Sequence, residues 1–245
     1  MQEPVILASD IGTSSVKSAI FDLSGTILDS ATRPHTTRHN QSGWSDQDPD
    51  DWWSGYQQTV RELVDRQPQV SERIAVIGVS GQMLGCLPLH PALTHADTRA
   101  ALTHADTRAA EQALQIEDHI GGGQLYTLTG NILDARSSLA KLLWFKQHRP
   151  SCYREADRFL QAKDFIVSRL TGLIDTTDLS DAAHAQWIDL KKRRYLTDVF
   201  NDLGLAAVKL PALHRGTDQV GKLTAAAARQ LSLKTGIPVV AGAGD

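Results

Sequence analysis

The sequence predicts an α/β protein in which helices pack on a β-sheet. Two apolar runs, Ile74–Ser80 and Ile237–Ala241, have the length and β-branched content of buried strands, and each leads into a glycine-containing loop. Between residues 53 and 64, apolar residues recur at the spacing of one helix face. With 245 residues, of which 41% are hydrophobic and 22% charged, the chain can bury a substantial core.

Charge and cysteine content limit the classes of partner. The net charge of -3 and the pI near 6.3 leave no basic footprint for nucleic acid or an anionic membrane, so a small-molecule ligand is expected. Cys86 and Cys152 lie far apart and match no metal spacing, which favours reduced structural thiols. The N-terminus lacks a signal-peptide pattern and no apolar run has the length of a membrane span, so we expect a cytoplasmic protein.

The first strand leads into a loop suited to phosphate. Val5–Ser9 is strand-like and continues through Asp10 into the turn Gly12–Ser15, after which a second strand begins at Val16. A carboxylate, hydroxyls and backbone N–H groups would meet there at one edge of a sheet, where they could hold a metal-bound phosphate. The alternative is an ordinary β-hairpin in which glycine only relieves the turn. This short motif by itself does not decide between them.

The next segments extend the sheet and then cover it. Residues 16–21 and Ile27–Leu28 are strand segments joined by the turn signal Asp22–Gly25, so three consecutive antiparallel strands are expected. Asp48 is a good helix N-cap and Pro49 suits the first helical position. The aromatic and aliphatic stripe that follows is expected to pack on the sheet as core rather than to bind a cofactor.

A second loop follows the strand Ile74–Ser80. Small residues in Gly81–Gly85 permit the close approach of a ligand or another strand. The segment Leu84–Leu89 is expected to return as a strand.

The nine residues ALTHADTRA then occur twice without a gap, at residues 92–100 and 101–109. The repeat is too short for a solenoid, and it is a local duplication, an artefact of the sequence, or a loop whose residues were assigned uncertainly. Because the second copy leads directly into a helical run, Asp106 and Arg108 are favoured as functional residues over Asp97 and Arg99.

Helical segments dominate the second half. Gly121–Gly123 is expected to be a flexible break, and the basic cluster at residues 191–194 a solvated face. The chain closes on a glycine-rich loop and Asp245, and a loop of this kind at the last residue suggests half of a larger protein. The predicted helices are Ser138–His148, Asp164–Leu170, Lys191–Leu203 and Val220–Leu231.

A series of short motifs covers essentially the whole chain. They are DIGTSSVK from Asp10, WSDQDP from Trp44, GQM from Gly81, the D-x-R of the repeated block, TGN from Thr129, KLLW from Lys141, KDF from Lys163, TG from Thr171, SDAA from Ser180 and GAGD at the end. In this order they resemble the N-terminal domain of the FGGY family of carbohydrate kinases, most closely its xylulokinase branch.

The resemblance implies a ribonuclease-H-like fold of the actin, Hsp70 and sugar-kinase superfamily, with a mixed sheet flanked by helices. Residues 1–245 would form the sugar-binding N-terminal domain, and a C-terminal nucleotide-binding domain would follow that this chain lacks. The fragment alone would therefore be inactive, because the cleft needs both domains. ATP and Mg²⁺ are the implied cofactors and a small-molecule sugar the substrate, while a homodimer stays an open alternative to a monomer.

The same resemblance assigns roles at the phosphate end. Asp245 would be the general base that takes the proton of the sugar hydroxyl, and Asp10 would hold Mg²⁺. The donors to the β- and γ-phosphates would be Gly12, Thr13, Ser14 and Lys17. An equal alternative for Lys17 is that it is only an exposed strand residue without a role in phosphate binding.

At the sugar end, the resemblance points to three loops. One departure from the family is Leu84, which stands where xylulokinases carry a histidine, and another is the His-Ala pair before the D-x-R block, where a Trp and a polar residue are usual. These departures weaken the D-xylulose assignment more than the kinase assignment. The implied contacts come from Gln82, Met83, Leu84, Asp106, Arg108 and the segment Asp134–Ser137.

Arg136 takes the place of a sugar-contacting aromatic in related kinases. It would suit an acidic or differently shaped substrate, although an ion pair with Asp134 is the favoured alternative.

Three functional hypotheses follow. The first is an ATP-dependent kinase acting on a hydroxyl of a ketopentose such as xylulose, or of another polyol or sugar acid. The second is a sugar-binding or regulatory protein on the same scaffold without catalysis, and the third is an actin-like assembly protein. The presence of both Asp10 and Asp245 favours the first, because a binding module needs neither a metal carboxylate nor a base.

Overall fold

The main sheet begins with three antiparallel strands, as predicted. The computed structural model describes residues 3–90 and 101–245. Within it, β1 (Val5–Ile11) pairs with β2 (Ser15–Phe21), and β2 pairs with β3 (Ile27–Pro34). The turn between β1 and β2 is therefore part of a hairpin at the edge where β1 ends.

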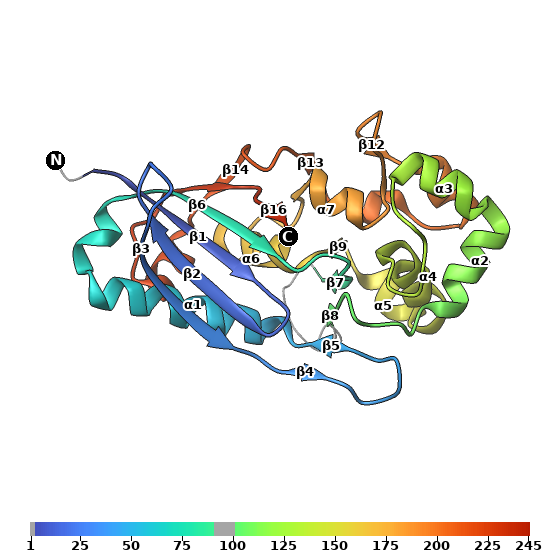
Figure 1. Ribbon diagram of the computed structural model, residues 1–245, viewed down its shortest axis with the longest axis horizontal. Coiled ribbons are helices and arrows are strands. Elements are labelled where there is room, and N and C mark those ends of the chain that lie inside the picture. Colours follow the sequence, from blue (N-terminus) through green and yellow to red (C-terminus); the bar gives the residue numbers. More distant parts are fainter. Residues whose placement is uncertain (1–2, 91–100) are drawn as a thin grey trace.

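Parallel strands complete this sheet. β6 (Ile74–Gly81) runs parallel to β1, and β15 (Pro238–Val240) and β16 (Ala243–Gly244) both run parallel to β6. With β14 (Gln219–Lys222) antiparallel to β15, the order is β3-β2-β1-β6-β15-β14, the mixed arrangement that the resemblance implied. Because β1, β6 and β16 are parallel, their carboxyl ends meet at one edge, where the chain terminus also lies (Figure 1).

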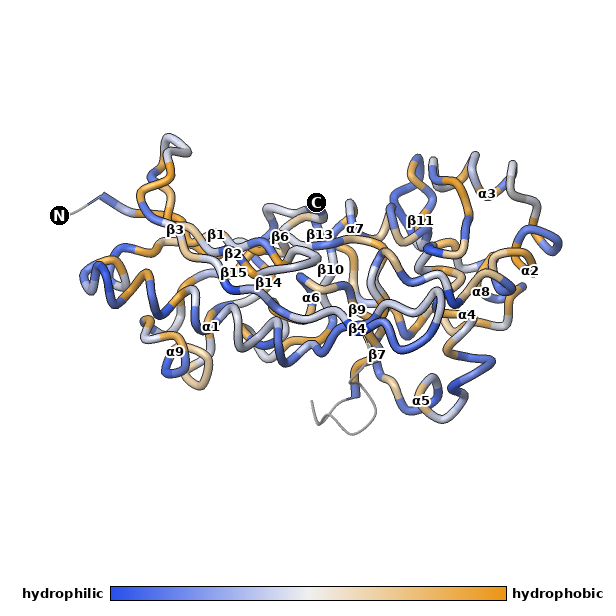
Figure 2. Tube along the Cα trace, turned by 60° about the horizontal axis from the view of Figure 1, so that its bottom comes forward, coloured by the Kyte–Doolittle hydropathy of each residue, from blue (hydrophilic) through white to orange (hydrophobic). Residues whose placement is uncertain are grey.

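Three helices pack with the sheet in one apolar core. They are α1 (Pro49–Arg66), α6 (Ala162–Thr171) and α9 (Ala225–Leu231). The helix α1 begins at the predicted cap, because a side-chain oxygen of Asp48 accepts a hydrogen bond from the Asp50 N–H at 3.0 Å. Its hydrophobic and hydrophilic residues alternate along the coil (Figure 2), which is the pattern of a helix with one buried face.

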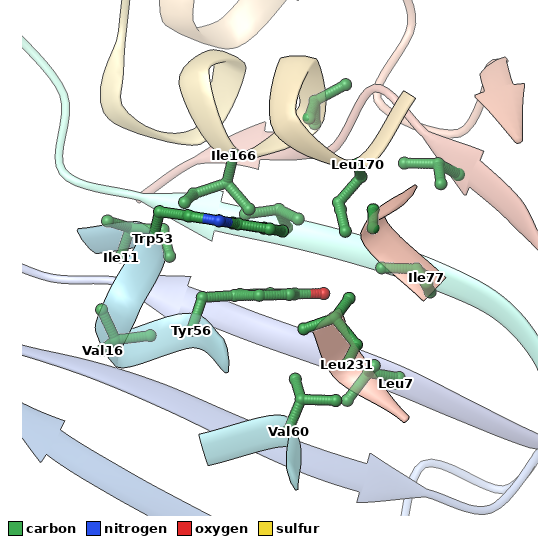
Figure 3. Close-up of a cluster of buried hydrophobic side chains, with 14 of the residues drawn as sticks. Leu7, Ile11, Val16, Trp53, Tyr56, Val60, Ile77, Ile166, Leu170 and Leu231 are labelled. Atoms are coloured by element: carbon green, nitrogen blue, oxygen red, sulfur yellow. The ribbon is translucent and has the colours of Figure 1, made fainter. Parts of the chain in front are cut away.

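The close-up in Figure 3 shows where this core is centred. Tyr56 and Trp53 of α1 lie against Leu7 of β1 and Ile166 of α6, and Tyr56 and Leu7 have no exposed surface. Burial of an aliphatic side chain such as Leu7 contributes about 1.5–3 kcal/mol. The apolar stripe of α1 that the sequence predicted as core therefore stabilises the contact between the sheet and the helices.

The burial pattern of β1 determines which way its polar residues face. Every second residue from Val5 to Ile11 is buried towards α1, and within this core Ser9, Ser18 and Thr59 satisfy one another through hydroxyl contacts of 2.8 and 2.7 Å. Asp10 lies on the opposite, half-buried face of the strand. The carboxylate is thereby kept out of the apolar core.

A second core lies beyond the sheet edge and includes the helices α2 (Ala110–Ile120) and α4 (Ser138–His148) at the right of Figure 1. Its fully buried side chains include Phe159 and Trp187. Helices that contribute buried residues to it include α2, α4 and α8 (Thr197–Asp202). The other helical elements are α3 (Gly122–Thr129), α5 (Pro150–Glu155), α7 (Leu179–His184) and the 3-10 turns Pro68–Glu72 and Ala207–Lys209.

Short strands pair outside the main sheet. They are β4 (Thr37–Arg38) with β5 (Asp46–Gln47), β5 with β8 (Ala101–Leu102), β7 (Leu87–Leu89) with β9 (Arg158–Leu160), β10 (Thr177–Asp178) with β13 (Leu213–His214), and β11 (Ile188–Asp189) with β12 (Arg194–Tyr195).

Two predicted helices are shorter than expected. The predicted helix over residues 191–203 is wrong in its first half, where Arg193 has a positive φ of 51° and β12 forms, and only α8 is helical. The helix predicted over residues 220–231 is wrong before Ala225, because β14 pairs with β15 and Thr224 then caps α9. In both cases tertiary pairing prevails over local propensity. The helix over residues 138–148 is confirmed at both ends, and that over residues 164–170 lies within α6.

Two loop predictions also need correction. The strand expected over Leu84–Leu89 is confined to β7, because Leu84 has a φ of 57° and turns the chain. The expected break at residues 121–123 is confined to Gly121, with a φ of 86°, and α3 begins at the next residue.

The remaining predictions concern the cysteines, the repeat and the membrane. Neither Cys86 nor Cys152 is part of a disulfide, as expected. The first copy of the repeat, with Asp97 and Arg99, lies outside the described residues. Among residues 3–90 and 101–245, no helix combines the length and apolarity that a membrane crossing requires.

Candidate active site

Two carboxylates meet at the edge where the parallel strands end. Asp10 of β1 is in register with Ser80 of β6, whose neighbour on the other side is Ala243 of β16. Asp245 follows β16 directly, and its N–H donates to the Gly81 carbonyl at 3.2 Å. Neighbouring strands lie about 4.8 Å apart and a strand rises about 3.3 Å per residue, so this pairing places the two aspartates on either side of β6, two residues out of level, with their backbones roughly 12 Å apart.

Burial and neighbouring charges shift the pKa of Asp10. Its pKa is raised, chiefly by burial and further by the negative charge of Asp245, while the cation of Lys17 lowers it. Lys17 is paired with Asp10 across β1 and β2, so the two side chains project from the same face. The buried Oδ1 of Asp10 accepts no hydrogen bond from the described residues.

An unpartnered carboxylate oxygen near a second carboxylate is suited to a hard cation. Mg²⁺ prefers oxygen ligands and retains several waters, so a site with few protein ligands fits it. The described residues contain no group of three or more His, Cys, Asp or Glu side chains arranged to hold a metal. The unpartnered Oδ1 of Asp10 could therefore serve as one oxygen ligand of such an ion.

The turn after β1 is tightly built. The Gly12 N–H donates to the Ser15 carbonyl at 3.0 Å, so this amide is not a free donor, contrary to the expectation for a phosphate loop. A Cβ at Gly12 would lie 3.2 Å from that carbonyl and 3.4 Å from Asp10 Oδ2, which explains the glycine. The exposed residues of this turn are Thr13 and Ser14.

Gln47 links this turn to the loop after β6. Its buried Nε2 donates to the Thr13 carbonyl and to the Thr37 hydroxyl, both at 2.7 Å, and its Oε1 accepts from Gln82 at 2.7 Å and from Trp52 at 2.9 Å. Gln82 keeps a buried Oε1 without a partner among the described residues. Sequence reasoning assigned Gln47 no role, although the WSDQDP motif contains it.

The loop after β6 is held in place from behind. The Lys141 ammonium, which has no exposed surface, donates to the carbonyls of Leu84 at 2.6 Å and Thr103 at 2.7 Å. Burial lowers the pKa of Lys141 to about 8. The Gly85 N–H donates to Gln161 Oε1 at 2.8 Å. Lys141 of the KLLW motif therefore fixes the positive-φ turn at Leu84.

Asp106 and Arg108 are built into the protein rather than presented to a ligand. Asp106 is 0% exposed and accepts from the Ser45 N–H at 2.7 Å, while Arg108 pairs with Asp106 at 2.7 Å and Asp46 at 3.0 Å. The Arg108 guanidinium lies 3.7 Å from the centre of the Trp44 ring. These contacts do not support the expected sugar contacts and instead join the D-x-R block to the WSDQDP segment.

Arg136 lies at the surface. Its side chain is 57% exposed and forms a 2.5 Å ion pair with Asp134. The favoured alternative from the sequence, an arginine paired with a neighbouring carboxylate, is therefore confirmed.

A buried charge cluster lies behind the loop that carries Asp245. The Lys163 ammonium, 0% exposed, contacts Asp164 at 2.6 Å, Asp178 at 3.0 Å and Asp181 at 3.2 Å. Burial raises the pKa of Asp181 to about 7, with Lys163 opposing the shift and the other two aspartates adding to it. Sequence reasoning noted Lys163, Asp164 and Asp181 only as members of the KDF and SDAA motifs.

The charge cluster is connected to β16. The Gly244 N–H donates to the Ser180 hydroxyl at 2.9 Å. A Cβ at Gly244 would lie 2.7 Å from Met83 Sδ and 2.9 Å from Asp181 Oδ1. The structure thus brings the GQM, SDAA and GAGD motifs together around the residue that precedes Asp245.

Known proteins resemble the chain over nearly its full length. The model of the FGGY family of carbohydrate kinases, N-terminal domain, matches residues 5–245. A xylulose kinase of Escherichia coli (strain K12) is 31% identical over 243 residues, which cover 96% of this chain and 47% of that protein. An autoinducer-2 kinase of Klebsiella pneumoniae subsp. pneumoniae is 29% identical over a match that covers 98% of this chain and 45% of that protein.

The fold is shared as well. The crystal structure of xylulose kinase from Rhodospirillum rubrum superimposes with a TM-score of 0.92 at 26% identity, covering 98% of this chain and 49% of that one. This likeness confirms the predicted fold class. The chain spans about half the length of the curated relatives that it matches.

Proposed function

The chain belongs to the FGGY family of carbohydrate kinases, and we propose that it forms the sugar-binding part of an ATP-dependent kinase that phosphorylates a hydroxyl of a ketopentose such as xylulose. The observation that carries this proposal is the meeting of Asp10 and Asp245 at one sheet edge, with an unpartnered oxygen on Asp10. A protein that only binds sugar needs neither carboxylate there.

In this proposal Asp245 accepts the proton of the attacking hydroxyl. Its side chain is exposed at the end of β16, so a bound sugar can reach it, and its backbone is held by Gly81. Asp10 would hold Mg²⁺, which supplies the neutralisation of phosphate charge that phosphoryl transfer requires. Thr13, Ser14 and Lys17 are exposed beside it and would donate to the phosphates.

The sugar is proposed to lie over the loop after β6. The buried Oε1 of Gln82 is an acceptor without a partner among the described residues, and a sugar hydroxyl would satisfy it. Met83 and Leu84 shape this surface, and Lys141 fixes the turn at Leu84. Because an apolar Leu84 offers no hydrogen bond, another polyol or a sugar acid is the alternative substrate.

We further propose that the nucleotide-binding half lies outside these 245 residues and that the chain alone does not turn over ATP. A cytoplasmic location and assembly as a monomer or homodimer are parts of the same proposal, which cell fractionation and sedimentation test directly.

The decisive experiment is an ADP-release assay on the full-length gene product with a panel of pentuloses, polyols and sugar acids. We expect turnover with a ketopentose, a loss of about 10²–10⁴-fold in kcat for Asp245→Asn, and little change for the control Asp65→Asn, an exposed acid on α1. Sugar binding without any turnover would reject the kinase in favour of the binding protein.

A further inference from the structure

We propose that Ser180 is a positioning residue for Asp245, acting through a partly buried bridge made of Lys163, Asp178, Ser180 and Gly244, hereafter the Ser180 bridge. The inference rests on the proposed role of Asp245 as base. It gives a function to the KDF and SDAA motifs. Neither sugar binding nor the charges of Asp10 and Asp245 explain why those motifs are present.

The first step is the orientation of the Ser180 hydroxyl. Its O–H donates to Asp178 Oδ2 at 2.6 Å, so the proton of the hydroxyl points away from β16. A lone pair on the same oxygen therefore accepts the Gly244 N–H at 2.9 Å. Alanine at this position would leave that N–H without its acceptor.

The second step is the orientation of Asp178. Its Oδ2 also accepts the Ser180 N–H at 2.7 Å as the N-cap of α7, while its Oδ1 lies 3.0 Å from the Lys163 ammonium. Lys163 in turn pairs with Asp164, whose Oδ2 accepts the Gln161 N–H at the start of α6. The bridge is thus anchored in two helices, and its charged members are almost fully buried.

The third step is the fit around Gly244. A Cβ added to this glycine would lie only 2.7 Å from Met83 Sδ and 2.9 Å from Asp181 Oδ1, so no larger residue fits without displacing them. The backbone around Asp245 is then held on two sides, by Ser180 at the Gly244 N–H and by Gly81 at the Asp245 N–H. Within the described residues, Ser180 is the side chain that bonds the backbone next to the proposed base.

A change at Ser180 should therefore act on the rate of transfer rather than on sugar affinity. The sugar-facing loop is fixed by Gln47, Lys141 and Gln161, none of which belongs to the bridge. A base misplaced by about 1 Å costs up to roughly 10²-fold in rate, because the reacting atoms must be aligned.

The test uses the full-length gene product with Ser180→Ala and the matched control Ser180→Thr, which keeps the hydroxyl. We expect kcat to fall about 10- to 100-fold in the alanine variant while KM for the sugar stays within about twofold, and the threonine variant to recover most of kcat. Amide hydrogen exchange of the peptide containing residues 243–245 should be at least about tenfold faster in the alanine variant only.

These two measurements separate the bridge from the proposed function. If wild-type protein phosphorylates no sugar, the kinase proposal fails, and exchange at residues 243–245 still decides whether the bridge holds β16. Unchanged exchange and unchanged kcat in Ser180→Ala would overturn the bridge. Equal losses in both variants, in step with a lower melting temperature, would also overturn it in favour of simple packing.

Discussion

Gly242→Ala should be among the most damaging small substitutions near the site. Gly242 joins β15 to β16 with a φ of 78°, and a Cβ there would lie 1.9 Å from the Val79 carbonyl oxygen of β6. The positive φ alone costs an alanine about 1–2 kcal/mol. Relief of the contact requires a displacement of roughly 1.5 Å to reach an ordinary separation, which adds about 1–3 kcal/mol of overpacking.

The matched control is Gly236→Ala. Gly236 has a similar φ of 85°, but nothing lies within 4 Å of the position that its Cβ would take. Urea denaturation of the two variants should therefore show a loss of about 1–2 kcal/mol in unfolding free energy for Gly236→Ala and about 2–5 kcal/mol for Gly242→Ala. The difference between them isolates the contact with Val79.

Gly242→Ala should also lower kcat of the full-length protein. The added Cβ forces β16 away from β6, and Asp245 directly follows β16. An unfolding free energy of Gly242→Ala no lower than that of Gly236→Ala would refute the steric argument. If Gly242→Ala loses the expected unfolding free energy but keeps its kcat, β16 relaxes without moving the carboxylate of Asp245.

Three further predictions concern charge and helix propensity. Lys163→Met leaves three buried carboxylates without their cation and should cost about 3–5 kcal/mol in unfolding free energy; a loss below about 1 kcal/mol would contradict the cluster as described. Asp181 has a folded-state pKa raised to about 7, so it binds its proton more tightly than in the unfolded chain, and stability should fall as the pH rises from about 4 to about 7. Asp181→Asn should flatten this part of the pH profile measured by urea denaturation, whereas an unaltered slope would show that other groups cause it. Gly123→Ala should raise the unfolding free energy by about 0.5–1 kcal/mol, because Gly123 lies in α3 with open space around its Cβ position. Gly121→Ala should lower the unfolding free energy, because Gly121 has a φ of 86°. Calorimetry that finds the same sign for both variants would contradict the assignment of the helix start.

The sequence predicted elements best where local chemistry and tertiary contacts agree. The Asp48 cap and Pro49 mark the start of α1, and the helix over residues 138–148 was predicted at both ends. Predictions failed where pairing with a distant strand decided the outcome, as at β14, or where a residue took an unfavourable backbone angle, as at Leu84. Such angles are stabilised by contacts such as that of Lys141 with the Leu84 carbonyl, which local sequence does not reveal.

The sequence by itself determined the strand and loop chemistry of this protein: Asp10 at the end of the first strand, Asp245 after the last, and the order of motifs between them. Only the tertiary structure decided what each motif does. Asp106 and Arg108 have the residue types of a sugar site but are buried in an ion-pair cluster, whereas Ser180 and Gln47 bond to the backbone of the two loops at the sheet edge. The physical reason is that the role of a polar side chain depends on its partners and its burial, and those come from segments distant in the chain.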